Sequence, residues 1–358
     1  MEDTLSTRVF AEEAFLRNIA HYLTRRWVHA FICALSQRMC LEEENHQRML
    51  AAAWDVCLVA LSFDPSQDGL KLYTLRLGTA AEWEEQLSGI PGNISVIIGD
   101  GTRVYGLGGN TDSLSIDLSN GETHTLPSRP AQHGPEAVVA GGRLIALGGY
   151  EAHERHHGTL GTLSSQVSAY CPMSNSWTQL ANMSVARSSN FACASDGVRV
   201  YVSGGLGDLG PLQSAEIFDT TSCNWSHWSH LPDMSKTRHR CAGAVDGTRF
   251  YAIGGQFDAT CEVLHASAEV LDAAASQGNV ANTSQWTRIP DAPLKDMFCK
   301  ATVAEGQIYV CTRARAAAYD PLRNRWITLN PVPGSCVTLC TALLPNSLAT
   351  SCPKRAVA

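Results

Sequence analysis

The chain has 358 residues, of which 44% are hydrophobic and 17% are charged, and its formal net charge is −7. This composition is ordinary for a folded globular protein and excludes a largely disordered chain. The acidic balance gives no general attraction to nucleic acid or to an anionic membrane, so either role would need a local basic patch.

The first residues, "MEDTLSTRVFAEEAFLRN", carry acids where a signal peptide has bases, and they contain no apolar core. No apolar run of 18 residues occurs, so the sequence predicts no membrane-spanning helix. Without an export signal, we interpret the 13 cysteines as reduced and mostly buried side chains. We therefore expect the protein in the cytoplasm or the nucleus.

Residues 10–50 have a helical pattern. Apolar side chains recur at helical spacing at Phe15, Ile19, Leu23, Trp27 and Phe31, and no Gly or Pro interrupts them. The pattern predicts a helical segment over residues 1–53, ahead of the first β-unit.

A β-unit of three strands follows this helical segment. It consists of "DVCLVALSFD" (55–64), "LKLYTLRL" (70–77) and a stretch beginning near Trp83. Because the residues before it are predicted to be helical, the unit lacks a first strand.

Further along, three stretches are nearly the same ten residues: "DGTRVYGLGG", "DGVRVYVSGG" and "DGTRFYAIGG", which begin at residues 100, 196 and 246. Glycine pairs start at 108, 148, 204 and 254, with spacings of 40, 56 and 50 residues. A period near 50 indicates a structural repeat. The glycines that mark it are Gly108, Gly109, Gly148, Gly149, Gly204, Gly205, Gly254 and Gly255.

Each repeat predicts four short antiparallel strands joined by tight turns, which is the pattern of a propeller blade. The glycines would let backbones pass closely, and the aromatic residues would fill the space between blades. A further unit, residues 305–326, keeps the aromatic positions but has no glycine pair. The tryptophans expected in the fourth strands are Trp177, Trp225, Trp286 and Trp326.

The apolar run "SCVTLCTALL" (335–344) has no unit of its own. We expect it to supply the missing first strand of the N-terminal unit and so to remove the open sheet edge. The fold is then an all-β, six-bladed β-propeller over residues 54–344, with residues 345–358 as a loose tail. Cys336 and Cys340 are four residues apart on this strand, so both are expected to face the same side, in the core.

The double glycine, the Tyr-Asp or Phe-Asp strand and the spaced Trp resemble the kelch repeat. The resemblance is carried by the units around 148–177, 204–225 and 254–286, and less fully by the others. It implies a kelch β-propeller.

The stretch "LTRRWVHAFI" (23–32), followed by "LSQRMCL", resembles the end of an F-box in plant F-box/kelch-repeat proteins, as does "LPDMSKTRHRCAG" between two units. A typical F-box opens with Leu-Pro, which is absent here, so the segment resembles a truncated or degenerate F-box. The resemblance implies a link to the Skp linker and cullin of an SCF-type ubiquitin ligase. The residues that would bind the Skp linker are Phe15, Ile19, Leu23 and Trp27. The alternative is a helical cap that covers apolar surface of the propeller.

A search for catalytic chemistry finds little. His153, His156 and His157 could bind a transition metal, but they lie in one predicted loop with no second ligand cluster, so a polar loop is the preferred interpretation. No C-x-x-C, phosphate-binding loop or nucleophile motif occurs. The sequence predicts no catalytic residue, no metal and no cofactor.

In a propeller, the linkers between blades and the loops after each second strand emerge on one side. On an acidic protein, basic residues gathered there would suit an acidic or carboxylate-bearing peptide. The candidate partner-binding residues are Arg155, Arg187, Lys236, Arg238, His239, Arg240, Lys295, Arg313 and Arg315.

These observations predict a non-catalytic module that binds a protein partner through one propeller face and presents it to an SCF-type ligase. One alternative is a kelch scaffold without a ligase link. Another is a propeller enzyme of the oxidase or epimerase kind, which would need a metal or an acid/base cluster at the propeller axis.

Overall fold

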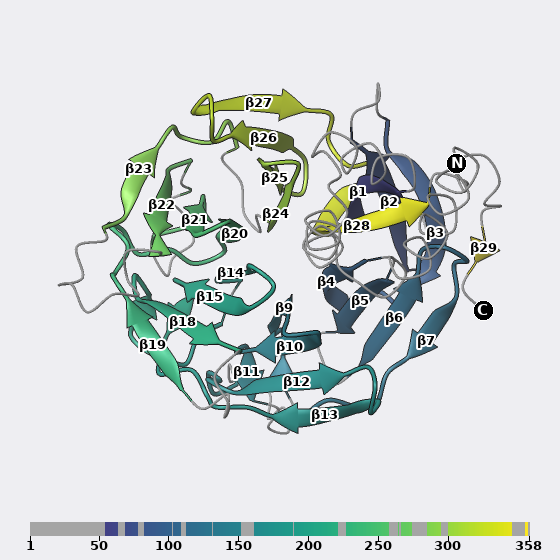
Figure 1. Ribbon diagram of the computed structural model, residues 1–358, viewed down its shortest axis with the longest axis horizontal. Coiled ribbons are helices and arrows are strands. Elements are labelled where there is room, and N and C mark those ends of the chain that lie inside the picture. Colours follow the sequence, from purple (N-terminus) through teal and green to yellow (C-terminus); the bar gives the residue numbers. More distant parts are fainter. Residues whose placement is uncertain are drawn as a thin grey trace, which may run out of the picture.

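In the computed structural model, six β-sheets are arranged as blades around a central axis (Figure 1). The structure describes residues 54–63, 69–77, 82–101, 103–108, 112–130, 132–151, 161–188, 190–220, 227–257, 264, 266–273, 285–294, 300–345 and 355–356. The predicted helical segment, residues 1–53, lies outside them. Within the described ranges, no helix has the length and apolar character needed to cross a bilayer.

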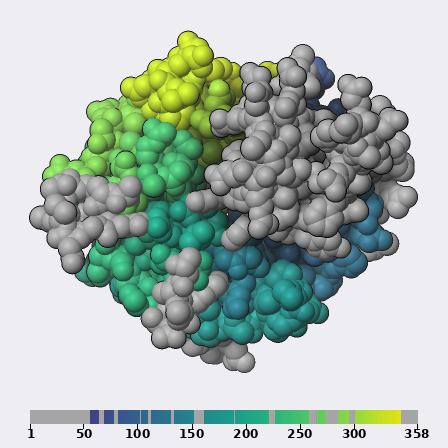
Figure 2. Space-filling view, in the orientation of Figure 1, coloured from purple at the N-terminus to yellow at the C-terminus, as the bar shows by residue number. Residues whose placement is uncertain are grey.

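The predicted six-bladed propeller is confirmed. Blades 2 to 6 each contain four antiparallel strands in chain order from the axis outward. Blade 2 consists of β4 (Ile94–Asp100), β5 (Arg103–Gly108), β6 (Ser113–Asp117) and β7 (Thr123–Thr125), and blade 3 of β9 (Glu136–Ala140), β10 (Arg143–Leu147), β12 (Val167–Cys171) and β13 (Ser176–Gln179). Blade 4 consists of β14 (Ala192–Ser195), β15 (Arg199–Ser203), β18 (Ala215–Asp219) and β19 (Trp228–Leu231), and blade 5 of β20 (Ala242–Asp246), β21 (Arg249–Ile253), β22 (Ala268–Asp272) and β23 (Thr287–Ile289). Blade 6 consists of β24 (Lys300–Ala304), β25 (Gln307–Cys311), β26 (Ala316–Asp320) and β27 (Arg325–Leu329). Their coloured residues pack side by side in the space-filling view (Figure 2).

Blade 1 joins the two ends of the propeller, as the sequence predicts. Its order from the axis is β28 (Ser335–Pro345), β1 (Trp54–Phe63), β2 (Leu70–Arg76) and β3 (Glu84–Ile90). β28 and β1 are antiparallel along their whole length, from the pair Trp54 and Pro345 to the pair Phe63 and Ser335. The innermost strand of this blade is therefore supplied by the C-terminal part of the chain.

Five short strands lie outside this pattern. β8 (Gln132–His133), in the linker before blade 3, pairs with β11 (Tyr150–Glu151), in the loop after β10. β16 (Leu206–Gly207) and β17 (Gly210–Pro211) form a small hairpin in the loop after β15. β29 (Arg355–Ala356) runs parallel to β3, so two residues of the tail that was expected to be loose are paired with blade 1.

A β-bulge in β28 corrects one expectation. The register between β28 and β1 shifts at Leu61 and Ser62, so β28 carries one extra residue there. Cys336 then packs with Leu339, whereas Cys340 packs with Val59 and Leu61 on the other side of the sheet. Both cysteines are buried as predicted, but the prediction that they share one side is wrong.

Tryptophans join five of the six blades to the blade before them; blade 2 has no tryptophan. The indole nitrogen of Trp177 donates a hydrogen bond to the carbonyl of Pro127, at 2.9 Å, where the chain leaves the preceding blade. The same bond recurs from Trp228 to Ala181, Trp286 to Pro232, Trp326 to Pro290 and Trp83 to Asn330. Each indole N–H thus gains a partner while the rings, partly or fully buried, fill the inter-blade space.

The tryptophan of blade 4 differs from the one expected. Trp225 lies outside the described residues, and the side chain opposite Phe218 in the β18–β19 register is Trp228. The rings of Phe218 and Trp228 are 5.1 Å apart, like those of Tyr319 and Trp326 in blade 6. Trp228 therefore takes the repeat position in this blade.

The glycine pairs lie where two chain segments cross. Gly148 and Gly204 have φ angles of 63° and 69°, in the left-handed region that glycine adopts without strain. A Cβ atom on either would lie 2.5 or 2.4 Å from the carbonyl oxygen of Arg187 or Arg238, in the linker to the next blade. The predicted close passage of backbones is thus present, at the linkers. Gly109 lies outside the described residues.

The innermost strands also approach each other closely. A Cβ atom on Gly243 of β20 would lie 2.5 Å from the amide nitrogen of Cys193 in β14, and one on Gly99 of β4 would overlap the carbonyl oxygen of Thr341 in β28. Neighbouring inner strands therefore meet backbone to backbone at these points, which only glycine permits.

We predict that Gly243→Ala destabilises the propeller by about 1–3 kcal/mol, because its methyl group must push β20 away from the β14 backbone. Urea unfolding followed by tryptophan fluorescence measures the loss. Gly92→Ala is the control, since no atom lies within 4 Å of a Cβ built there. Equal midpoints for the two variants would contradict this account of inner-strand packing.

Candidate functional site

The propeller has two faces, which we name by the connections that form them. The loop face consists of the linkers between blades, such as 180–191 and 232–241, and the loops after each second strand, such as 204–214. These connections touch: Gly149 donates its N–H to the carbonyl of Arg187 at 3.0 Å, and Gly205 to that of Arg238 at 2.7 Å. The hairpin face, opposite, consists of the turns that join first to second strands and third to fourth strands.

Arg187 lies in a loop-face linker, but its side chain is fully buried, with 0% exposed. Its guanidinium donates to Glu216 at 2.6 Å and to the carbonyl of Gly204 at 2.7 Å. Burial lowers the pKa of Arg187, and the neighbouring Glu216 carboxylate opposes that shift. The prediction that Arg187 contacts a partner is therefore wrong: it anchors the linker to blade 4.

Arg238 makes the same contacts in the next blade. Its guanidinium donates to Glu269 at 2.9 Å and to the carbonyls of Gly254 and Ser267, and 1% of the residue is exposed. His239, beside it, is 2% exposed and forms a backbone bridge with Gln256. Neither side chain can reach a partner in this structure, so both partner-contact predictions are wrong for the same physical reason.

The repeats themselves contain the signal that sequence reasoning missed. The two blades whose linkers carry these arginines are the two whose third strands read "SAE", with Glu216 and Glu269. In blades 3 and 6 the equivalent third-strand residues are Ser168 and Ala317, so these two blades have no glutamate at this position. An Arg and a Glu that occur together in the same repeats indicate an ion pair.

Four of the other candidate residues are described, and all are at least partly exposed. Lys236 is exposed, with its ammonium 5.0 Å from the ring centroid of Phe257, and Arg240 donates to Gln256 at 3.2 Å. Arg313 and Arg315 are exposed on the short turn between β25 and β26. Their role in partner binding stays a prediction.

The remaining candidates lie outside the described residues. They are Arg155, Lys295 and His153, His156 and His157 on the loops, and Phe15, Ile19, Leu23 and Trp27 of the helical segment.

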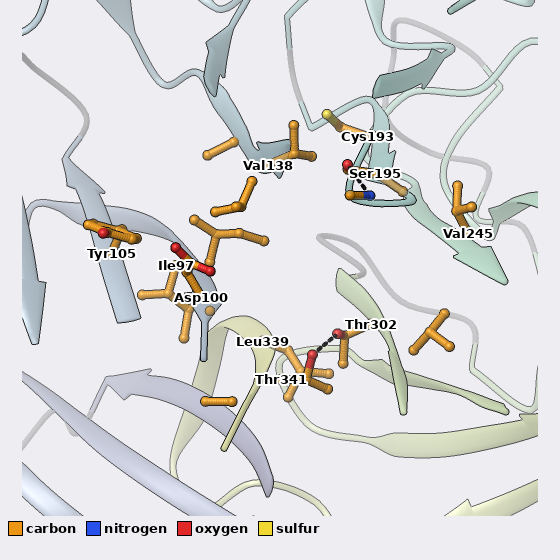
Figure 3. Close-up of a pocket in the computed structure, with 18 of the residues that line it drawn as sticks. Ile97, Asp100, Tyr105, Val138, Cys193, Ser195, Val245, Thr302, Leu339 and Thr341 are labelled. Carbon is orange, nitrogen blue, oxygen red and sulfur yellow. Dashed lines mark hydrogen bonds between the residues drawn. The ribbon is translucent and has the colours of Figure 1, made fainter. Parts of the chain in front are cut away.

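A central channel runs along the propeller axis between the innermost strands, with a volume of about 1270 Å³. Its walls are mostly apolar and come from all six blades, as the close-up shows for Ile97, Val138, Val245 and Leu339 (Figure 3). Near the loop face it is crossed by an ion pair. Lys300 of β24 donates to both carboxylate oxygens of Glu136 of β9, at 2.7 and 2.9 Å.

This ion pair joins blades 3 and 6, which lie opposite each other in the ring. Both side chains are largely buried, so each satisfies the charge of the other. Within the described ranges, no three His, Cys, Asp or Glu side chains come together in a way that could hold a metal ion.

Comparison with known proteins gives a consistent picture of the repeats. The kelch motif model matches residues 133–184. The chain is 34% identical over 148 residues to "F-box/kelch-repeat protein At1g67480" of Arabidopsis thaliana, covering 40% of this chain and 37% of that protein. It is 26% identical over 254 residues to "Kelch-like protein 25" of Xenopus tropicalis, covering 66% and 40% respectively.

A solved structure titled "Structure of YjhT" superposes with a TM-score of 0.55 at 14% sequence identity, over 68% of this chain and 85% of that one, which shows a shared fold. The chain spans about two fifths of the length of the first two curated relatives.

We predict that Arg238→Ala destabilises the protein by about 3–5 kcal/mol, because Glu269 would be left in a buried site without its ionic partner. Arg315→Ala, on the exposed turn, should change stability by less than about 0.5 kcal/mol. Chemical denaturation of both variants beside the wild type measures the difference. A wild-type unfolding midpoint for Arg238→Ala would show that the buried pair adds no stability.

Proposed function

We propose that this kelch-repeat β-propeller, a protein-interaction module, is the substrate-recognition adaptor of an SCF-type ubiquitin ligase. The observation that carries the proposal is the similarity to proteins named F-box/kelch-repeat, which coincides with an F-box-like sequence ahead of the first blade. In this role the segment 1–53 binds the Skp linker and the propeller binds the target.

The path of the chain supports a division of labour between the two ends of the propeller. β28 follows the linker 330–334 and therefore begins at the loop face and ends, at Pro345, at the hairpin face. Trp54 is the register partner of Pro345, so the segment 1–53 joins the propeller at the hairpin face. The loop face lies at the far end of blade 1 from this junction, where a target could bind without meeting the point of attachment.

The target would bind the loop face through its exposed cations. Lys236, Arg313 and Arg315 are exposed and Arg240 is partly exposed, and all four lie on or beside connections of blades 5 and 6. Arg155 and Lys295, which the sequence predicts for the same face, lie outside the described residues. Because arginine forms paired hydrogen bonds with carboxylates, an acidic segment of the target is the complementary chemistry.

The proposed role is non-catalytic and requires no cofactor. The two charged groups that meet near the channel axis, Glu136 and Lys300, bind each other. We place the protein in the cytoplasm or nucleus, the compartments in which we expect the Skp linker and cullin to be met. The alternative is a kelch scaffold without a ligase link, and failure of the following binding experiment would favour it.

Purified full-length chain mixed with the Skp linker should form a complex that survives size-exclusion chromatography. Replacing Leu23 and Trp27 with Asp should abolish it, because a charge in an apolar helix interface cannot be solvated. The control is Leu209→Asp, since Leu209 is fully exposed at the tip of the β16–β17 hairpin, in a loop-face connection of the propeller. If wild-type protein forms no complex, the ligase role is excluded and a scaffold remains.

For the loop face, we expect the double change Lys236→Glu and Arg315→Glu to weaken target binding by about tenfold or more, since it replaces attraction to an acidic segment with repulsion. The target is first isolated with wild-type chain and then titrated in purified form. Arg325→Glu, an exposed cation at the hairpin face, should bind as wild type does. A weakening that is the same for both would refute the assignment of the loop face.

A further inference from the structure

Three copies of the Asp-Gly turn stand at the hairpin end of the central channel, with Asp100, Asp196 and Asp246 all on its wall. Two of these carboxylates are engaged within their own turns. Asp196 accepts hydrogen bonds from the backbone N–H groups of Val198 and Arg199, at 2.9 and 2.7 Å. Asp246 accepts one from the guanidinium of Arg249, at 3.1 Å.

Asp100 occupies the same turn position but makes neither contact. Its carboxylate accepts no hydrogen bond and forms no ion pair with any residue of the described ranges. Figure 3 shows the side chain at the end of β4, reaching into the cavity near Ile97. Burial raises the pKa of Asp100, and the charge of Arg103 acts in the opposite direction.

Arg103, from the same turn, lines the cavity together with Asp100, and the channel wall farther from this turn is mostly apolar. Val138 and Val139 of β9 and Leu339 of β28 line the same cavity, as does Ile97. Asp100 is partly buried and accepts no hydrogen bond, so its carboxylate loses hydration without a direct replacement, and a bound cation would offset that cost. A mostly apolar cavity with a few polar groups on its wall is the usual form of a small-molecule site.

We propose that the central channel binds a small organic cation, an amine or ammonium group on an apolar chain, with its charge paired to Asp100. The apolar chain would lie along the valine, isoleucine and leucine side chains of the channel. The ammonium of Lys300 at the opposite end is held by Glu136, and Asp196 and Asp246 are engaged within their own turns. Asp100 is therefore the carboxylate that we expect to pair with the ligand's positive charge.

A metal ion is the less suitable occupant. Divalent cations take several oxygen, nitrogen or sulfur ligands, and the described residues form no cluster of three such side chains. One carboxylate beside apolar walls matches a single positive charge on a hydrocarbon. This proposal does not depend on the ligase role, because its ligand, site and assay are separate.

The test is calorimetric titration of the full chain with hexylammonium chloride, with hexanol and hexanoate as matched probes of equal chain length. We expect saturable binding of hexylammonium, weaker binding of hexanol and none of hexanoate. Asp100→Asn should weaken hexylammonium binding by at least about tenfold, whereas Asp246→Asn, in the equivalent turn, should retain it.

Absence of saturable hexylammonium binding to wild-type protein would overturn the proposal, as would equal binding by Asp100→Asn. The comparison of the three probes on wild-type protein tests the sign of the charge without any substitution. It therefore decides the matter even if Asp100→Asn does not fold, and equal binding of hexanoate would refute the role of Asp100.

Discussion

The pairing of β28 with β1 is the constraint on which the rest of the molecule depends. A ring of blades has no free sheet edge only if its first and last strands meet. Here the C-terminal strand takes the innermost place in the N-terminal blade, beside β4, where Ile97 donates its N–H to the Thr338 hydroxyl at 3.2 Å. That junction closes the six blades into a ring, and the closed ring sets the width of the channel and the positions of both faces.

Within the closed ring, most of the strong charges near the loop face serve the architecture. Arg187 and Arg238 bind a glutamate and backbone carbonyls of the blade that follows, and they hold the linkers against the glycine pairs. Because these cations are neutralised by buried partners, they add little to the field outside the protein. In the proposed role, recognition at this face would use the exposed cations of the described connections, Lys236, Arg313 and Arg315.

Much of the fold could be predicted from the sequence because turn residues and aromatic residues recur at the same places in each repeat. The six units and the closure followed from "DGxRxY", the glycine pairs and an unassigned apolar strand. Details of register could not be predicted: one extra residue in β28 separates Cys336 from Cys340, and "NWSHW" offers two tryptophans of which Trp228 faces Phe218. The burial of Arg187 was not predicted, because its partner Glu216 is 29 residues away in the sequence. The sequence also could not show that Asp100 differs from Asp196 and Asp246, because the three turns have nearly the same residues and only the last two aspartates accept hydrogen bonds within their turns.

The register of the closing strands has a mechanical consequence. Trp54 and Pro345 are partners at one end of an antiparallel pair, so the chain enters and leaves blade 1 at the same point. A force that pulls the two ends apart would load the terminal hydrogen bonds first and open the pair like a zipper, one bond after another. A pair loaded along its length would instead share the force among all its bonds. The β1–β28 pair that closes the ring is therefore also the place where the ring would open most easily when both ends of the propeller are pulled apart.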